Sequence, residues 1–251
     1  MRHTHIKNIV LLSVSVLALS ACGTTSGTDS ASLDRTAKID NVLERAAREA
    51  SRGGHTEQSL GIMENRYKRN SNDPAIATEY ARALREMDYL NRASIVLSPF
   101  ARDPDGSLAA KNEFAAIQLA LGNYVMAEDF AKQVIIADQQ NAQAFQYLGI
   151  ALDAQGMYEE AERAYRKGLD TWEGDPTSIM NNLALNLATQ GYIDEAVEIL
   201  EKAQSIAPDR VEVERNLRIV RTLQETTHWS QKKTKEKSIN VVPKKKPAQD
   251  S

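Results

Sequence analysis

The sequence predicts an all-α fold, a solenoid in which one helix–turn–helix unit is stacked repeatedly. Ala93, Ala127, Ala161 and Ala196 hold the same place in a recurring pattern, at spacings of 34, 34 and 35 residues. Apolar residues follow a helical period from about residue 33 to residue 227, without the alternation typical of strands. A period of about 34 residues is typical of paired helices that must stack to bury their apolar faces. Such stacks form an extended concave surface.

The clearest units are residues 142–176 and 177–210. In the first, Gly156 separates a helix with large apolar residues from a second helix that carries Tyr158, Ala161 and Tyr165. The second unit repeats this order with Met180, Leu183, Ala184, Leu187, Gly191, Ile193, Ala196, Leu200, Ala203 and Pro208. The order resembles the tetratricopeptide repeat (TPR). This resemblance implies a right-handed TPR solenoid that binds other proteins.

Earlier units follow the same register with decreasing fidelity. Residues 108–141 and 74–107 match well, although Asp88 stands where the other units have glycine. Residues 35–73 form a degenerate unit. Residues 211–228 predict one further amphipathic helix, which would cap the stack. Tyr124, Tyr158 and Tyr165 fall at packing positions of the repeat, so we expect them in the core rather than in a ligand-stacking stripe.

The N-terminus predicts export and lipidation. Residues 1–21 combine basic residues with an apolar run that is too short to span a bilayer, as in a signal peptide. They end in Leu-Ser-Ala before Cys22, the single cysteine of the chain. This resembles a bacterial lipobox, which implies a diacylglycerol-modified, palmitoylated cysteine and a membrane anchor at Cys22. The alternative is an ordinary signal peptide followed by an incidental cysteine. Gly23 in place of Asp favours the outer membrane, by resemblance to bacterial lipoproteins.

The segments that flank the repeats have a different composition. Residues 22–34 are small and polar, which predicts a flexible lipidated tether. Residues 229–251 are rich in lysine without apolar periodicity, which predicts a disordered basic tail. The net charge of −3 does not indicate nucleic-acid binding. Attraction of the tail to anionic lipid, cell-wall polymer or an acidic partner, and simple solubilisation, both remain open.

Catalytic, metal and cofactor sites are not predicted. His3 and His5 lie in the signal peptide, and neither His55 nor His228 has a second ligand at metal-binding spacing. With Cys22 lipidated there is no thiol nucleophile, and no glycine-rich phosphate loop follows a strand. We therefore expect a non-enzymatic protein without a cofactor.

A candidate peptide-binding groove follows from the TPR resemblance, because the first helix of each TPR unit faces inward. Amides offer both donors and acceptors to an extended backbone, and arginines favour carboxylates. The inward positions are Arg48, Arg52, Arg82, Arg85, Asn112, Gln143, Gln146, Asp153, Asn181 and Arg215. Ordinary solvated helix faces are the alternative for each of these residues. The Lys and Asn pair that clamps a C-terminal carboxylate in chaperone-binding TPRs is absent.

A lipobox joined to a short TPR solenoid resembles a set of bacterial envelope proteins. In its size, its number of units and its leading tether, the chain most resembles the tight-adherence (Tad/Flp) pilus assembly TPR lipoproteins. This implies a scaffold at the outer membrane, facing the periplasm, that holds a segment of a secretin or another pilus component. An adaptor for cell-wall enzymes or for outer-membrane protein assembly is the alternative.

Overall fold

The computed structural model describes residues 26–239, and the side chains of residues 37–229. Within that range the chain forms only helices. They are α1 (Ser26–Arg52), α2 (Thr56–Arg69), α3 (Pro74–Glu86), α4 (Leu90–Ala101), α5 (Leu108–Ala120), α6 (Tyr124–Ala137), α7 (Ala142–Ala154), α8 (Tyr158–Asp170), α9 (Thr177–Gln190), α10 (Ile193–Ile206) and α11 (Val211–Ile239). The prediction of an all-α solenoid is confirmed.

The 34-residue period is visible in the backbone as well as in the sequence. One residue between the two helices of each unit has a positive φ: Gly54 (76°), Asp88 (62°), Gly122 (76°), Gly156 (78°) and Gly191 (92°). Glycine tolerates this left-handed conformation without cost, and Asp is among the few other residues that adopt it. Asp88 therefore makes the same turn as the glycines, and the degenerate first unit shares it.

The repeated small residues lie where the period predicts. All four alanines that define the repeat are fully buried, so the second helices pack closely at these points. The expectation for the three tyrosines is only partly correct. Tyr165 is 1% exposed, but Tyr124 and Tyr158 are 38% and 40% exposed. Each of these two is the first residue of its helix, where a side chain projects beyond the packed layer.

Helix starts show local capping. The Asp73 side chain accepts hydrogen bonds from the backbone N–H groups of Ala75 (2.8 Å) and Ile76 (3.3 Å), and Pro74 opens α3. The pair Asp103–Pro104 also has this chemistry in the sequence, but it lies in the turn before α5. Ser107 caps α5 instead, by accepting from the Ala110 backbone N–H at 3.1 Å.

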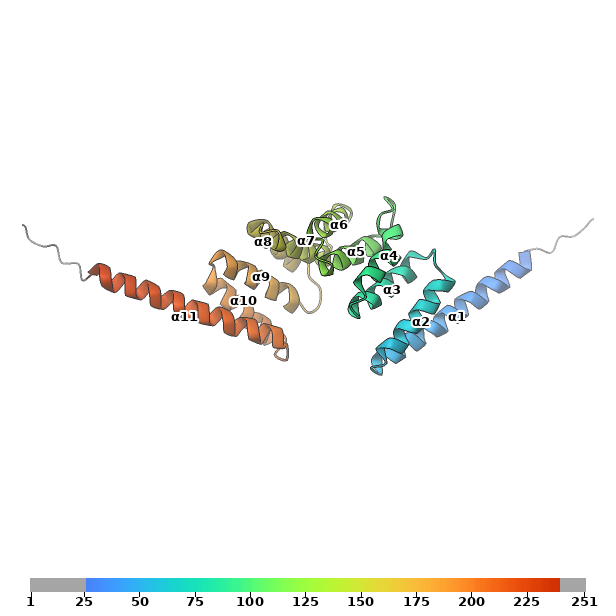
Figure 1. Cartoon of the computed structure of the whole chain (residues 1–251), viewed down its shortest axis with the longest axis horizontal. Helices are drawn as coiled ribbons and strands as arrows, with labels where there is room; N and C mark the ends of the chain where they lie inside the picture. Colours follow the sequence, from blue (N-terminus) through green and yellow to red (C-terminus); the bar gives the residue numbers. More distant parts are fainter. Residues whose placement is uncertain (1–25, 240–251) are drawn as a thin grey trace, which may run out of the picture.

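The helices stack into an arch (Figure 1). The odd-numbered helices from α3 to α11 approach one another in sequence, each with Cα atoms within 8 Å of the next, whereas α4, α6, α8 and α10 have no such contact among themselves. A stack that is closer on one side than on the other curves, so the odd helices form its inner side. The α1–α2 hairpin and α11 stand at the two ends of the arch.

The buried apolar side chains form two clusters. The N-terminal cluster extends from Leu60 to Ala131 and contains Tyr80, Phe114 and Phe130. The C-terminal cluster extends from Leu152 to Val220 and is mostly aliphatic. Leu148 on α7 packs against both.

Two predicted flanking segments overlap the ends of the described region. Helix α1 begins at Ser26 and so includes residues 26–34 of the predicted tether. The first turns carry Asp and Ser residues, which suit a helix N-terminus, and extending an existing helix costs little. Helix α11 likewise continues past residue 228 to Ile239, into the segment expected to be disordered. No helix within residues 26–239 is both long and apolar enough to span a membrane. The signal peptide, Cys22 and residues 240–251 lie outside the described residues.

Candidate binding groove

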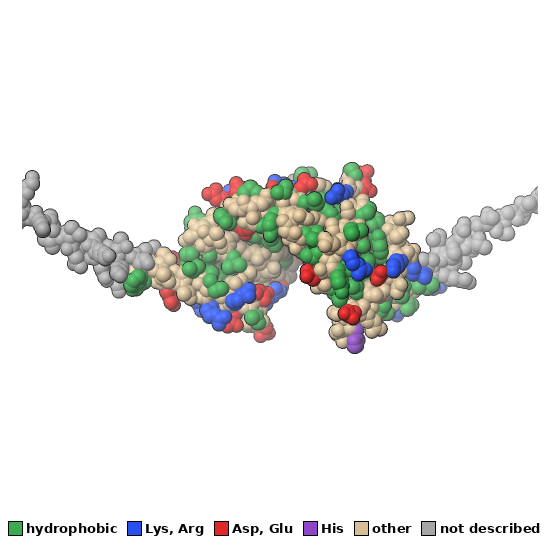
Figure 2. All heavy atoms as spheres, in the orientation of Figure 1, with side chains coloured by type: hydrophobic (Ala, Val, Ile, Leu, Met, Phe, Trp, Pro, Cys, Tyr) green, Lys and Arg blue, Asp and Glu red, His purple; other side chains and the backbone are tan. Residues whose placement is uncertain are grey.

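The inner side of the arch forms a hollow between its two ends, with basic and acidic side chains on both of its walls (Figure 2). Its floor consists of the inner helices α3, α5, α7 and α9, and α11 closes one end. We call this hollow the inner groove. Most of the candidate residues predicted from the repeat register lie on these helices, and the structure shows which of them meet.

The N-terminal part of the groove contains a buried carboxylate held by two arginines. Glu113 on α5 is 3% exposed. It accepts hydrogen bonds from Arg82 Nε at 2.9 Å and from Arg85 Nε at 2.7 Å, both on α3. Tyr147 on α7 lies nearby: burial raises the pKa of its phenol to about 12, and the negative charge of Glu113 adds to the increase. The two predicted arginines therefore meet, and their partner is within the chain.

Neutral polar side chains join the other inner helices. Three hydrogen bonds, each 2.8 Å long, connect consecutive inner helices: Asn112 Nδ2 to Gln143 Oε1, Gln146 Nε2 to Ser178 Oγ, and Asn216 Nδ2 to Asn181 Oδ1. Asn112 Oδ1 is buried and has no hydrogen-bond partner within the described residues. Gln143 is exposed, so its amide also faces solvent. These amides both tie the stack together and line its inner side.

Asp153, at the end of α7, is the centre of a second polar cluster. The Tyr165 hydroxyl donates to Asp153 Oδ2 at 2.8 Å, and Asn186 Nδ2 donates to Asp153 Oδ1 at 2.5 Å. Asn186 also donates to the Tyr158 carbonyl at 2.9 Å. Burial raises the pKa of the Asp153 carboxyl, and the two hydrogen bonds only partly oppose that rise. Among the described residues, no Lys or Arg forms an ion pair with this carboxylate.

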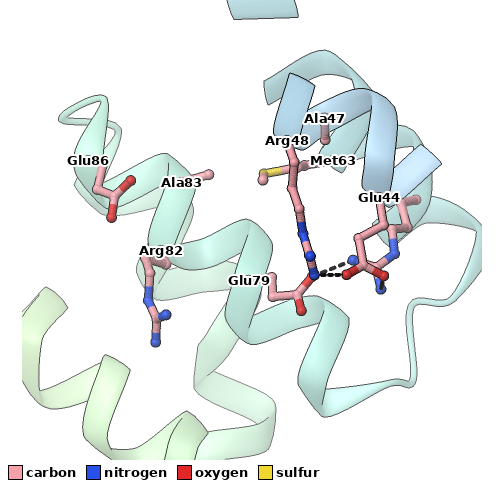
Figure 3. Close-up of a pocket in the computed structure, with 9 residues that line it drawn as sticks. Glu44, Ala47, Arg48, Met63, Glu79, Arg82, Ala83 and Glu86 are labelled. Carbon is pink, nitrogen blue, oxygen red and sulfur yellow. Dashed lines mark hydrogen bonds and ion pairs between the residues drawn. The ribbon is translucent and has the colours of Figure 1, made fainter. Parts of the chain in front are cut away.

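A second pocket, of about 260 Å³, lies at the N-terminal end between α1, α2 and α3, and Arg82 of the inner groove also lines it (Figure 3). It exists because α1 and α3 have no Cα atoms within 8 Å of each other, unlike the later inner helices. Arg66 on α2 bridges the gap by pairing with Glu44 on α1 and Glu79 on α3. Arg48 pairs with Glu44 and lines this pocket.

The remaining predicted residues do not join a cluster. Arg52 is exposed at the last turn of α1, and Arg215 is exposed on α11. The register alone did not single out Glu113 or Asn186. A signal was present, because the polar contacts between inner helices recur at separations of 28 to 35 residues, close to the repeat length.

The described residues contain no group of three or more His, Cys, Asp and Glu side chains that could hold a metal ion.

The inner groove is open to solvent along the inner side of the stacked helices (Figure 2).

Comparison with known proteins agrees with this geometry. Tetratricopeptide-repeat family models match residues 177–210 and 147–167. Among solved structures, TTC0263, a thermophilic TPR protein of Thermus thermophilus, superposes with a TM-score of 0.63 at 20% identity, covering 72% of this chain and 98% of that one. MamA (residues 41 to the end) of Desulfovibrio magneticus superposes with a TM-score of 0.55 at 20% identity, covering 68% and 97%. No curated protein matches the sequence. The chain thus carries tetratricopeptide repeats on a scaffold suited to protein–protein interaction.

Proposed function

We propose that this TPR solenoid is a non-enzymatic, lipid-anchored scaffold whose inner groove holds a segment of another envelope protein. The observation that supports binding is the continuous inner face of α3, α5, α7 and α9. This face presents amides, arginines and one carboxylate that receives only neutral donors within the described residues, beside apolar side chains. Amides can pair with an extended backbone, and a rigid stack keeps them in place without ordering cost on binding.

The anchor rests on the sequence around Cys22. The only cysteine follows an apolar leader at the position where lipidation requires a thiol. Several acyl chains on one cysteine hold a protein stably at a bilayer, because each buried methylene contributes about 0.8 kcal/mol. With Gly23 next in the chain, we place the anchor in the outer membrane, with the solenoid in the periplasm.

We further propose that the process is assembly of a Tad/Flp-type pilus or its secretin. The support is the combination of lipobox, short TPR stack and overall size, by resemblance. Because a fold does not by itself determine a process, the partner needs a direct test.

The test combines two substitutions next to the anchor. Cys22→Ala should release the protein from the membrane fraction and abolish piliation, because the scaffold is no longer held at its site. Gly23→Asp should keep the lipid but leave the protein in the inner membrane, again without pili. Gly23→Ser is the matched control and should behave like the wild type. Normal pili in the Cys22→Ala strain would refute the pilus assignment.

Crosslinking the intact protein in the cell envelope identifies the partner. A secretin or another pilus component among the products is the expected result. A cell-wall hydrolase or synthase instead would favour the adaptor alternative.

A further inference from the structure

The C-terminal part of the inner groove contains a pocket beside Asp153. It has a volume of about 470 Å³ and lies between α7, the start of α8 and α9. Ile150, Ala154 and Leu185 form apolar walls around Asp153, and Tyr158 stands at the edge. Leu185 is 38% exposed, which is unusual for a leucine on a helix that buries most of its other apolar residues. We call this the Asp153 pocket.

The Asp153 carboxylate is held in place but not neutralised. Its two hydrogen-bond donors, the Tyr165 hydroxyl and the Asn186 amide, are both uncharged. A carboxylate offers about four acceptor sites, so further donors can be accommodated. Its partial burial disfavours the charged form and raises the pKa of the carboxyl. A negative charge at an apolar-walled site attracts a cation more strongly than one in bulk water does.

The repeat register shows that this arrangement is specific to one unit. The positions equivalent to Asp153 in the other units hold Ser51, Arg85, Leu119 and Ala188. The positions equivalent to Tyr165 hold Met63, Leu97, Ala131 and Leu200. Neither the acid nor the hydroxyl that orients it is therefore needed to build the repeat.

We propose that the Asp153 pocket binds a lysine or arginine side chain of the peptide segment that the groove holds, with Asp153 as its counter-ion. Lys and Arg combine an apolar stem with a charged end, which matches apolar walls around one carboxylate. The exposed Tyr158 ring at the edge can add a cation–π contact. This assignment rests on the proposed function, because it names the chemistry of the segment bound by the same groove.

The N-terminal part of the groove is expected to prefer an acidic residue of the bound peptide, in contrast to the basic residue expected at Asp153. Arg82 uses only Nε on Glu113, and half of its side chain (51%) is exposed. Arg82 lies where α3 contacts α5, and Asp153 lies where α7 contacts α9. These two contacts are two helix-to-helix spacings apart along the inner side of the stack. Helix axes pack about 8–10 Å apart, so the two points are separated by roughly 16–20 Å. An extended peptide spans this in about five or six residues. The segment is therefore expected to carry an acidic residue that many positions from its basic residue.

The experiment uses the full chain, purified in mild detergent and immobilised, with a phage-displayed random dodecapeptide library as the probe. Selections are run on the wild type, on Asp153→Asn and on Asp170→Asn, a control that removes a carboxylate at the end of α8. Lys or Arg should be enriched at one peptide position with the wild type and the control, and this enrichment should disappear with Asp153→Asn. Asparagine keeps the shape of the side chain and still contacts Tyr165 and Asn186, so folding is retained, which circular dichroism verifies.

A selected peptide then allows a direct test of the pair. Replacing its basic residue with norleucine should weaken binding to the wild type at least tenfold, because a charge pair is lost. The same replacement should change binding to Asp153→Asn by less than twofold. Selected peptides without a preferred basic residue, or an equal loss on both proteins, would refute the Asp153 assignment and leave the scaffold function standing. Failure to select any peptide would refute both.

Discussion

Each of the two parts of the inner groove contains one carboxylate with hydrogen-bond donors around it, but the donors are charged in one part and neutral in the other. Glu113 in the N-terminal part is almost fully buried and lies between two arginines, so its charge is neutralised within the fold. Asp153 in the C-terminal part is half-buried and receives only neutral donors among the described residues. A buried charge without a partner is costly, and evolution usually avoids it. Glu113 therefore serves the structure, whereas the charge of Asp153 is left for a ligand only under the proposal made above.

The two apolar clusters differ in a related way. The N-terminal cluster fills its space with aromatic rings, including an edge-to-face pair between Phe114 and Phe130 with centroids 4.8 Å apart. The C-terminal cluster contains one large exception, Tyr165, which is accommodated by Gly149 on the facing helix. A Cβ on Gly149 would lie 2.4 Å from Tyr165 Cε1. In each cluster, different side chains fill the available space. A substitution in one cluster can therefore leave the packing of the other unchanged.

The largest expected effect is on the N-terminal cluster. Phe114→Ala should lower the free energy of unfolding by about 3–5 kcal/mol, because it leaves a cavity in a fully buried site. In a solenoid the loss should be local, so amide hydrogen exchange should accelerate more in α3–α6 than in α9–α10. Leu183→Ala, in the C-terminal cluster, is the matched variant and should reverse this order. Equal acceleration in both regions would show one cooperative core instead of two.

The next largest effect is expected where the Tyr165 ring packs against Gly149. Gly149→Ala should cost about 1–3 kcal/mol, since the added methyl overlaps a buried ring. Tyr165→Leu in the same chain should recover most of this loss, because other units pair Ala81 with Leu97 and Ala184 with Leu200 at these positions. Urea unfolding of the two single variants and the double variant gives the coupling free energy. Additive losses would contradict the proposed compensation.

These contacts show how far the sequence predicts the structure. The repeat period and the buried alanines follow from spacing, because small residues are required wherever two helices meet closely. Facing contacts between units do not follow, since they depend on how far each inner helix slides along the next. Glu113 thus has the sequence character of a solvated acid but is buried under two arginines. Tyr124 and Tyr158 have the sequence character of core residues but begin their helices and stay exposed.

A smaller effect is expected at the buried carboxylate of the N-terminal part. Glu113→Gln keeps the size of the side chain but removes its charge. Its one amide oxygen can accept from only one of Arg82 and Arg85, because the amide nitrogen is itself a donor. Both arginines reach solvent, which limits the loss to about 1 kcal/mol, the usual value for one hydrogen bond. Chemical denaturation measures it. Glu113→Ala should cost more, because it also leaves a void. A stabilised Glu113→Gln variant would show that the arginines do not offset the burial of this charge.

The smallest effect, and the one with opposite sign, is expected at Asp153. Because the pKa of its carboxyl is raised in the folded state, the folded protein binds more protons than the unfolded chain between the two pKa values, and ionisation of Asp153 opposes folding. Asp153→Asn should therefore be at least as stable as the wild type at pH 7. The advantage should shrink as the pH falls through the folded pKa, because the wild-type carboxyl then becomes neutral as well. Thermal unfolding of both proteins at intervals from pH 7 to pH 4 measures this difference.

An Asp153→Asn variant that is less stable than the wild type at pH 7 would show that the charge of Asp153, like that of Glu113, holds the fold together. A variant that is equally or more stable, yet unable to select basic peptides, would show that the chain keeps this charge at the expense of stability because binding requires it.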